Sequence, residues 1–205
     1  MKEETIRTLA YYEGAAEKFA EETGEAEFSC LQDSFAAMLP AGGRILDLGC
    51  GAGRDSRAFL KKGFLVTSVD GSRRLCRLAE RRTGQAVFCT TFEAYEPLGR
   101  LDGIWACASL LHLVPEDIKK TVRRTAAHLK TGGIFYLSFK YGTFRGYRGE
   151  RYFTDLTEKG LKEIFTGLTE LTLIKTEVTE DVRPARAGEL WLNGFFRKKG
   201  KETCL

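Results

Sequence analysis

The sequence predicts an α/β fold, a three-layer sandwich around a doubly wound, mostly parallel seven-stranded sheet whose last strand is antiparallel. The first observation is that short apolar segments of strand length alternate with helical segments. The second is that the segment around Leu46 reads RILDLG without polar alternation, as a strand buried on both faces does. The third is that no helix-length segment separates the last two strand-like segments, which predicts an antiparallel pair.

Length and composition fit a single domain. The chain has 205 residues, of which 43% are hydrophobic and 29% charged, with a formal net charge of +4. We expect residues 1–40 to form a helical cover and residues 41–205 the core. The charge is too modest to indicate a nucleic-acid partner. Because no apolar run approaches the roughly 20 residues that span a bilayer, and the acidic N-terminus is no secretory signal, we expect a cytoplasmic protein without a membrane partner.

The expected elements follow one another in a regular order. A helix over 5–21 and a second over 28–40, stopped by Pro40, precede the first strand. Strands are expected at 44–49, 64–70, 86–90, 101–108, 132–139, 171–178 and 190–198. Helices are expected at 54–62, at 72–82 with Ser72 as N-cap, at 115–129 and at 157–165. The carboxyl ends of the parallel strands should surround one ligand site.

The six cysteines do not form a recognisable framework. They are Cys30, Cys50, Cys76, Cys89, Cys107 and Cys204, and no two make a C-x-x-C pair. Zinc sites and disulfide scaffolds show closer paired spacing. We expect reduced, mostly buried thiols and no metal.

A glycine loop follows the first strand. Asp47 to Gly53 reads D-x-G-x-G-x-G between a predicted strand and a predicted helix, which lets the backbone approach a bound group closely. The dinucleotide pattern G-x-G-x-x-G would need a glycine at Arg54 or Ser56. Asp70 ends the second strand, where a carboxylate accepts both hydroxyls of a ribose. That carboxylate serves a nicotinamide cofactor and S-adenosylmethionine equally.

Four ordered motifs resemble a known family. The glycine loop, the acid ending the second strand, LDGIWACASLLHL and LKTGGIFYLSF together resemble the class I S-adenosylmethionine-dependent methyltransferases, whose fold is Rossmann-like. In detail the chain resembles the short bacterial, tellurite-resistance-like group, through GCGAGRDSRAFL, ACASLLHL and SFKYG.

The resemblance implies roles by position for a bound S-adenosylmethionine, whose product is S-adenosylhomocysteine. The glycine backbone would hold the methionine end, with Asp47 near its amino group. Asp70 would bind the ribose beside Gly71, Thr91 and Phe92 would flank adenine, and Cys107 and Ala108 would border the sulfonium. The expected cofactor-binding residues are Asp47, Gly49, Gly51, Gly53, Asp70, Gly71, Thr91, Phe92, Cys107 and Ala108.

The chemistry of methyl transfer demands alignment more than a catalytic triad. Holding two reactants in line contributes up to roughly 7–11 kcal/mol. A base is needed only when the attacking atom keeps its proton at neutral pH. His112, after the fourth strand, is the candidate base, and a structural histidine opening a helix is the alternative reading.

The segment 138–155 holds basic and aromatic residues over the expected site. It is long for a connection and could act as a lid. Its arginines offer donors for an anionic small molecule, although arginine beside aromatics also stacks on RNA bases. The expected substrate-binding residues are Tyr12, Lys140, Tyr141, Arg145, Arg151, Tyr152, Arg183 and Trp191.

These observations favour methyl transfer from S-adenosylmethionine to a small, anionic acceptor molecule. An RNA (tRNA) methyltransferase is the first alternative. A nicotinamide-dependent oxidoreductase and a non-catalytic cofactor-binding protein are the others.

Overall fold

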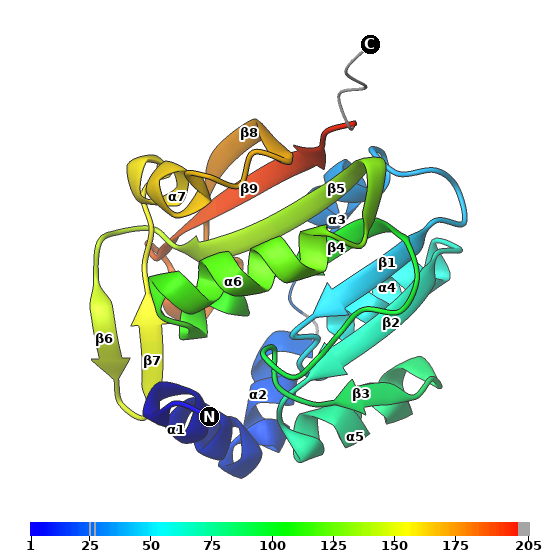
Figure 1. Cartoon of the computed structure of the whole chain (residues 1–205). Coiled ribbons are helices and arrows are strands. Elements are labelled where there is room, and N and C mark those ends of the chain that lie inside the picture. The colour runs from blue at the N-terminus through cyan, green and yellow to red at the C-terminus, as the bar shows by residue number, and fades with distance from the viewer. Residues whose placement is uncertain (25, 27, 201–205) are drawn as a thin grey trace.

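The computed structural model describes residues 1–24, 26 and 28–200. A seven-stranded sheet runs through its centre in the order β3-β2-β1-β4-β5-β9-β8 (Figure 1). The strands are β1 (Arg44–Leu48), β2 (Leu65–Asp70), β3 (Val87–Cys89), β4 (Leu101–Ala106), β5 (Leu129–Lys140), β8 (Leu171–Glu180) and β9 (Leu190–Lys198). β1 to β5 pair in parallel, whereas β9 lies antiparallel to both β5 and β8. The predicted fold class is confirmed, including the antiparallel last strand.

Helices cover both faces of this sheet. They are α1 (Glu3–Gly14), α2 (Ala16–Gly24), α3 (Ser29–Ala36), α4 (Arg54–Lys61), α5 (Arg73–Thr83), α6 (Pro115–Ala126) and α7 (Glu158–Phe165). Successive strand residues face opposite sides. Accordingly, Leu46 and Ile104 pack with α6 and α7, whereas Ile45 and Trp105 pack with α3 and α4.

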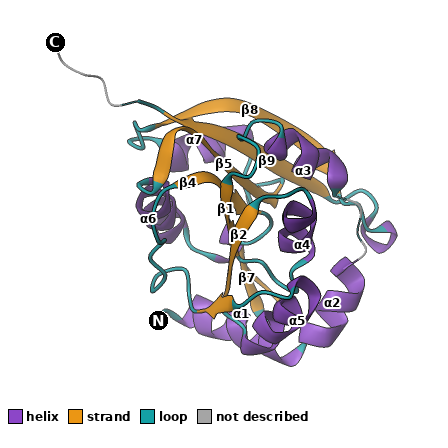
Figure 2. Cartoon of the chain, turned by 90° about the vertical axis from the view of Figure 1, so that its right-hand side faces the viewer, coloured by secondary structure: helices purple, strands orange, loops and turns teal. Residues whose placement is uncertain are grey.

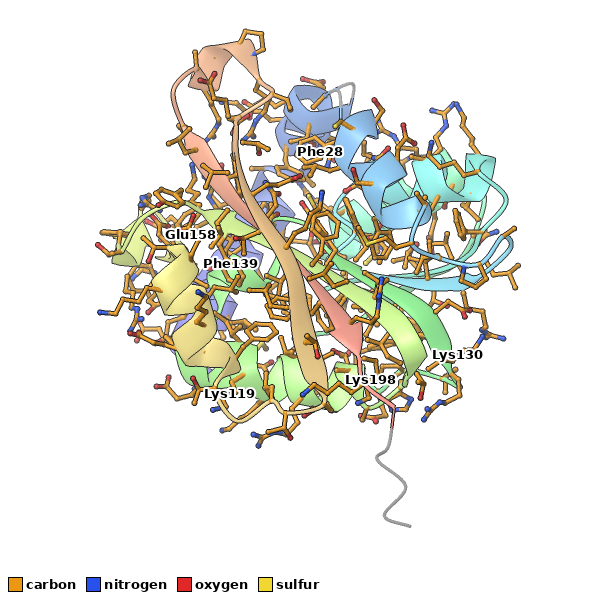
Figure 3. All side chains as sticks on the ribbon, turned by 90° about the horizontal axis from the view of Figure 1, so that it is seen from above. Phe28, Lys119, Lys130, Phe139, Glu158 and Lys198 are labelled. Carbon is orange, nitrogen blue, oxygen red and sulfur yellow. The ribbon has the colours of Figure 1, made fainter. Side chains whose placement is uncertain are left out.

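The register of β5 and β9 sets the far edge of the sheet. Ile134 pairs with Arg197 and Lys140 with Trp191. Lys130 and Lys198 therefore lie toward one end of the sheet, and Phe139 lies toward the other (Figure 3). This second end holds the carboxyl ends of the parallel strands, where a ligand site is expected.

The N-terminal segment differs from the expected single helix. The chain breaks between α1 and α2, where Ala15 leaves helical geometry with φ −112° and ψ 15°. Gly14 precedes this break, and glycine lowers helix propensity. Both helices pack against α5 at the same end of the molecule (Figure 2).

A second sheet was not expected from the sequence. The basic segment after β5 contains an antiparallel hairpin of β6 (Arg145–Arg148) and β7 (Arg151–Thr154). Gly149, at φ +61°, opens its two-residue turn, a position that favours glycine. The hairpin lies beside α1 (Figure 1), and the Tyr152 amide donates to Thr8 Oγ1 at 3.1 Å.

The thiols are less buried than predicted. Cys50 and Cys76 are buried and Cys107 is half-buried, but Cys30 and Cys89 are exposed. Cys204 lies outside the described residues. Within the described ranges, no helix combines the length and apolar character needed to cross a bilayer.

Candidate active site

One cavity of about 310 Å³ opens at the carboxyl ends of β1, β2, β4 and β5. Most of the predicted site residues line it. They are Tyr12, Gly49, Gly51, Asp70, Gly71, Thr91, Phe92, Cys107, Ala108, His112, Lys140, Arg151, Arg183 and Trp191. Its volume is in the range of small-molecule sites.

The glycine loop turns between β1 and α4. Gly49 has φ +86°, and a Cβ there would lie 2.4 Å from Ser109 Cβ. The loop therefore lies too close to its neighbours to carry a side chain at this position. Gly53 is required for helix packing, because a Cβ added at this position would lie 3.0 Å from Ala79 Cα in α5. It permits α4 and α5 to pack and does not line the cavity.

Asp70 is held rigidly at the end of β2. Its carboxylate accepts from the Gly51 amide and from the Ser72 amide, both at 2.9 Å. Burial raises the pKa of Asp70 to about 6, against the lowering effect of the Ser72 and Gly51 amides. A carboxylate offers about four lone-pair sites. The two amides leave acceptor capacity directed at the cavity.

Ser72 caps α5 as predicted and also ties α1 to the site. Its Oγ accepts from the Leu75 amide at 3.3 Å and donates to Glu13 Oε2 at 2.7 Å. Glu13 also accepts from the Arg74 amide at 3.2 Å. The N-terminal cover is thereby anchored beside Asp70.

Asp47, which is expected beside the cofactor's amino group, is buried and does not line the cavity. It is 2% exposed, and Ser56 Oγ donates to its Oδ2 at 2.5 Å. Ser56 in turn shares a hydrogen bond with Ser68 Oγ at 2.8 Å. Asp47 therefore fastens α4 to the sheet beneath the glycine loop.

The buried Asp47 predicts a pH dependence of stability. Burial raises the pKa of Asp47 to about 8, from an ordinary value of about 4 in the unfolded chain. Because the folded state holds this proton more tightly, its contribution is fully present below about pH 4 and is lost as the pH rises through about 8.

We expect the free energy of unfolding of the wild type, measured in urea from pH 5 to 8, to fall relative to that of Asp47→Asn. The difference should approach about 1.4 kcal/mol per pH unit at most. Asparagine keeps the shape but cannot ionise. Identical pH slopes for the two proteins would refute the assignment.

Arg54 and Asp55 form a buried ion pair that sequence reasoning missed. Arg54 donates twice to Asp55, at 2.7 and 2.9 Å, and its guanidinium lies 4.1 Å from the Phe28 ring centre. Asp55 also accepts from Gln32 at 2.7 Å and from Trp105 at 2.8 Å. Burial alone would raise the pKa of Asp55, but the Arg54 guanidinium and the hydrogen bonds from Trp105 and Gln32 together lower it. The pair joins α3, α4 and β4.

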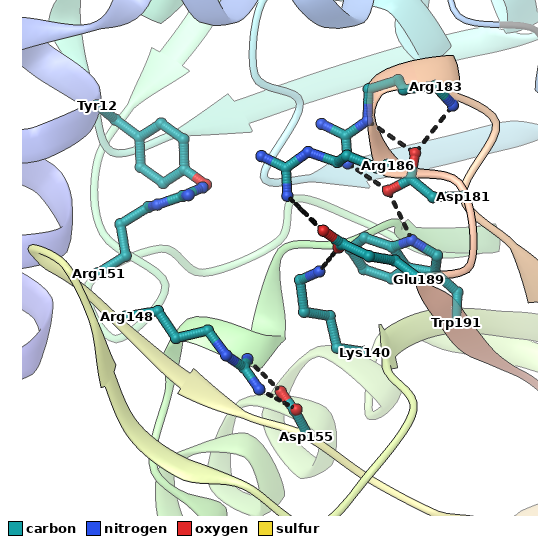
Figure 4. Close-up of polar contacts among 10 residues, drawn as sticks. All are labelled: Tyr12, Lys140, Arg148, Arg151, Asp155, Asp181, Arg183, Arg186, Glu189 and Trp191. Atoms are coloured by element: carbon teal, nitrogen blue, oxygen red, sulfur yellow. Dashed lines mark hydrogen bonds and ion pairs between the residues drawn. The ribbon is translucent and has the colours of Figure 1, made fainter.

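Most of the basic side chains drawn in Figure 4 are paired with acids. Lys140 and Arg186 both contact Glu189, and Arg148 binds Asp155. Arg183 donates to Asp181 at 2.8 Å, and Trp191 Nε1 donates to the same carboxylate at 3.0 Å. These arginines are therefore occupied within the protein.

The surroundings of Arg151 differ from those of these paired cations. Its guanidinium lies 4.5 Å from the Tyr11 ring centre and 5.2 Å from that of Phe153, and its Nη1 donates to Tyr12 Oη at 3.3 Å. Among the described residues, no carboxylate lies within ion-pair distance of it. Arg151 thus offers an uncompensated positive charge to the cavity.

Three expected substrate residues lie elsewhere. Tyr141 is 38% exposed and donates to Glu158 at 3.1 Å, and Arg145 is exposed on β6. Tyr152 packs against Tyr147, with ring centres 5.6 Å apart. Strand alternation explains this, because Arg151 and Phe153 face the cavity and Tyr152 points the other way.

Further lining residues were not anticipated from the sequence. They are Thr8, Leu9, Phe19, Arg54, Ser109 and Ser138, among others. Arg54 stands directly after the glycine loop, and Ser138 sits at the carboxyl end of β5, so position alone could have indicated both. Leu9 and Phe19 carry no such signal.

The sequence of this chain is similar to those of known methyltransferases. Residues 45–133 match the family described as "Methyltransferase domain". The ubiquinone biosynthesis O-methyltransferase of Coxiella burnetii (strain RSA 493 / Nine Mile phase I) is 32% identical over 142 residues, which cover 64% of this chain and 60% of that protein. The putative methyltransferase YqeM of Bacillus subtilis (strain 168) is 29% identical over 60% of this chain and 53% of its own.

Solved structures show the same fold. The 1,6-didemethyltoxoflavin-N1-methyltransferase of Burkholderia thailandensis, with bound 1,6-didemethyltoxoflavin and S-adenosylhomocysteine, has a TM-score of 0.75 at 23% identity, covering 96% of this chain and 89% of that one. A TehB-like S-adenosylmethionine-dependent methyltransferase of Corynebacterium glutamicum has a TM-score of 0.66 at 22% identity, covering 93% and 99%.

The fold, with its strand order, is that of the class I methyltransferases. Residues 45–133 are similar to a methyltransferase domain, and methyltransferases are among the curated relatives and solved structures that match this chain. It spans about 60% of the length of the curated relatives matched first. The cofactor prediction is confirmed by the S-adenosylhomocysteine bound in a structural homologue. The tellurite-resistance-like subgroup stays a prediction, because the TehB-like protein is one neighbour among others.

The residues present fit this cofactor. The glycine loop has no side chains at Gly49 and Gly51, and the Asp70 carboxylate keeps acceptor capacity for ribose hydroxyls. Phe92 and Leu75 supply apolar walls.

Proposed function

We propose that this protein transfers a methyl group from S-adenosylmethionine to a small acceptor that carries one anionic group. The observation that carries the proposal is that one cavity is lined both by Asp70 and the glycine loop and by Arg151, which has no acidic partner among the described residues. When bound, S-adenosylmethionine supplies a methyl group whose bond to sulfur breaks with the electron pair left on sulfur.

The chain's own residues bind and orient the reactants. In this proposal Gly49, Gly51, Asp70 and Gly71 hold the cofactor, Thr91 and Phe92 flank its adenine, and Cys107 and Ala108 border the reacting methyl group. Burial raises the pKa of Cys107 to about 12. Its thiol therefore stays protonated and does not compete with the acceptor as a nucleophile.

The paired cations favour a small acceptor over RNA. Lys140, Arg148, Arg183 and Arg186 are neutralised by acids inside the protein, which leaves little positive charge to follow a phosphate backbone. The helix α1 and the β6–β7 hairpin also meet at the cavity. A site bounded in this way suits a compact molecule.

The acceptor charge can be tested with a panel of compounds. Purified protein and S-adenosylmethionine are incubated with small phenols, aromatic carboxylic acids and neutral amines, and S-adenosylhomocysteine is measured by mass spectrometry. We expect turnover with acidic members of the panel. Turnover confined to neutral amines would refute the anionic acceptor, and turnover confined to tRNA would favour the RNA alternative.

A further inference from the structure

A chain of hydrogen bonds connects His112 to Arg151. His112 Nδ1 lies 2.7 Å from the Tyr152 carbonyl oxygen, His112 Nε2 lies 2.8 Å from Tyr12 Oη, and Tyr12 Oη lies 3.3 Å from Arg151 Nη1. The three side chains come from η1 (Leu110–His112), α1 and β7. All three line the cavity.

The Tyr152 carbonyl fixes the donor and the acceptor in each of these hydrogen bonds. The Tyr152 carbonyl can only accept, so Nδ1 of His112 carries the hydrogen. In a neutral imidazole Nε2 is then an acceptor, and the Tyr12 hydroxyl must donate to it. A lone pair of the Tyr12 oxygen consequently receives Arg151.

We propose that His112 and Tyr12 are positioning residues that hold the Arg151 guanidinium toward the acceptor, and that neither removes a proton from it. This inference rests on the proposed function. It gives His112 a role different from the base that the sequence suggested, and the two roles make different predictions.

The surroundings of His112 do not favour proton uptake. The polar groups that face it are the Tyr12 hydroxyl from α1, the Arg151 guanidinium and the Tyr152 carbonyl from β7, and the Phe153 ring lies 4.8 Å away. A proton on His112 would add a second cation near Arg151. Burial, together with Arg151, lowers the pKa of His112 to about 4, against the raising effect of the Tyr152 carbonyl.

Tyr12 is no better as a base. Burial raises the pKa of its hydroxyl, although Arg151 opposes the shift. A phenol of this kind keeps its proton at neutral pH. In this proposal the acceptor enters already ionised, so that neither Tyr12 nor His112 removes a proton when the acceptor's new bond to carbon forms.

The backbone anchors this arrangement from both sides. Tyr152 gives its amide to Thr8 on α1 and its carbonyl to His112 on η1. Arg7 adds an ion pair with Glu150 at 3.1 Å. Arg151, between these anchors, is set in position before an acceptor arrives.

Nitrogen NMR of the histidine-labelled full chain tests the inference without turnover. We expect His112 to show the neutral form with hydrogen on Nδ1, unchanged from pH 8 to pH 5. His112→Gln assigns the signal against that of His128. A hydrogen on Nε2, or a titration near the ordinary histidine pKa of about 6.5, would overturn the inference.

Variants separate a positioning role from a base. His112→Gln keeps an acceptor for Tyr12, so kcat should stay within about threefold of the wild type. His112→Ala loses it, and KM for the acidic acceptor should rise by roughly 2- to 13-fold with kcat nearly unchanged. Arg151→Ala should raise that KM about 10- to 100-fold. If kcat falls far below that of the wild type in both His112→Gln and His112→Ala, His112 is a base and the inference is wrong.

Two controls distinguish a failure of this inference from a failure of the proposed function. Calorimetric affinity for S-adenosylhomocysteine should be unchanged in His112→Gln and Arg151→Ala, because neither contacts the glycine loop or Asp70 in the hydrogen-bond network. If the wild type turns over no acceptor, the proposed function fails, whereas the NMR result still decides the state of His112.

Discussion

Replacement of Asp55 by alanine is expected to lower the free energy of unfolding by about 3–5 kcal/mol, because it leaves the buried Arg54 guanidinium without its partner. Asp55 is 6% exposed and accepts from Arg54, Gln32 and Trp105. Three elements lose a common anchor at once. Urea unfolding followed by tryptophan fluorescence measures the change.

The matched control is Asp33→Ala. Asp33 also forms an ion pair, with Lys62 at 2.5 Å, but its side chain is 60% exposed. Exposed pairs contribute about 0–1 kcal/mol. If the free energy of unfolding falls equally in the two variants, burial does not make the Arg54–Asp55 pair more stabilising than an exposed pair.

Replacement of Asp70 by alanine is expected to weaken binding of S-adenosylhomocysteine by about 100-fold or more. Two hydrogen bonds from ribose hydroxyls to a carboxylate contribute roughly 1.5–3 kcal/mol each. Asp70 also orders the Gly51 and Ser72 amides, so its loss loosens the glycine loop. Isothermal titration calorimetry measures the dissociation constant.

Thermal unfolding of Asp70→Ala must accompany the titration, since a misfolded variant would also fail to bind. Asp33→Ala serves again as the control, because it lies outside the cavity and should bind normally. A folded Asp70→Ala with wild-type affinity would remove Asp70 from the cofactor site.

The fold, and the position of Gly49, Gly51 and Asp70 at the cavity, could be predicted from the sequence because their causes are local. Unbroken apolar strands, Ser72 as a cap and glycines at close approaches all act within a few residues. For Asp47 the sequence indicates the position in the motif but not the direction of the side chain. Its position matches the motif, but its side chain turns under the loop to Ser56, which no pattern of residue types reveals.

The acceptor end could not be predicted, because its chemistry depends on long-range pairing. The sequence offers Lys140, Arg183 and Arg151 as equivalent cations, yet Glu189 and Asp181 neutralise the first two. The hairpin alternation that turns Tyr152 away from the cavity was also hidden, because the segment was expected to be a loop. Only the folded chain distinguishes Arg151.

Titration of the wild-type chain with S-adenosylhomocysteine and, separately, with NADH tests the central claim most directly. The glycine loop and Asp70 together should bind one S-adenosylhomocysteine per chain and show no heat of binding with NADH. Binding of NADH, or the absence of any S-adenosylhomocysteine binding by folded protein, would contradict the account.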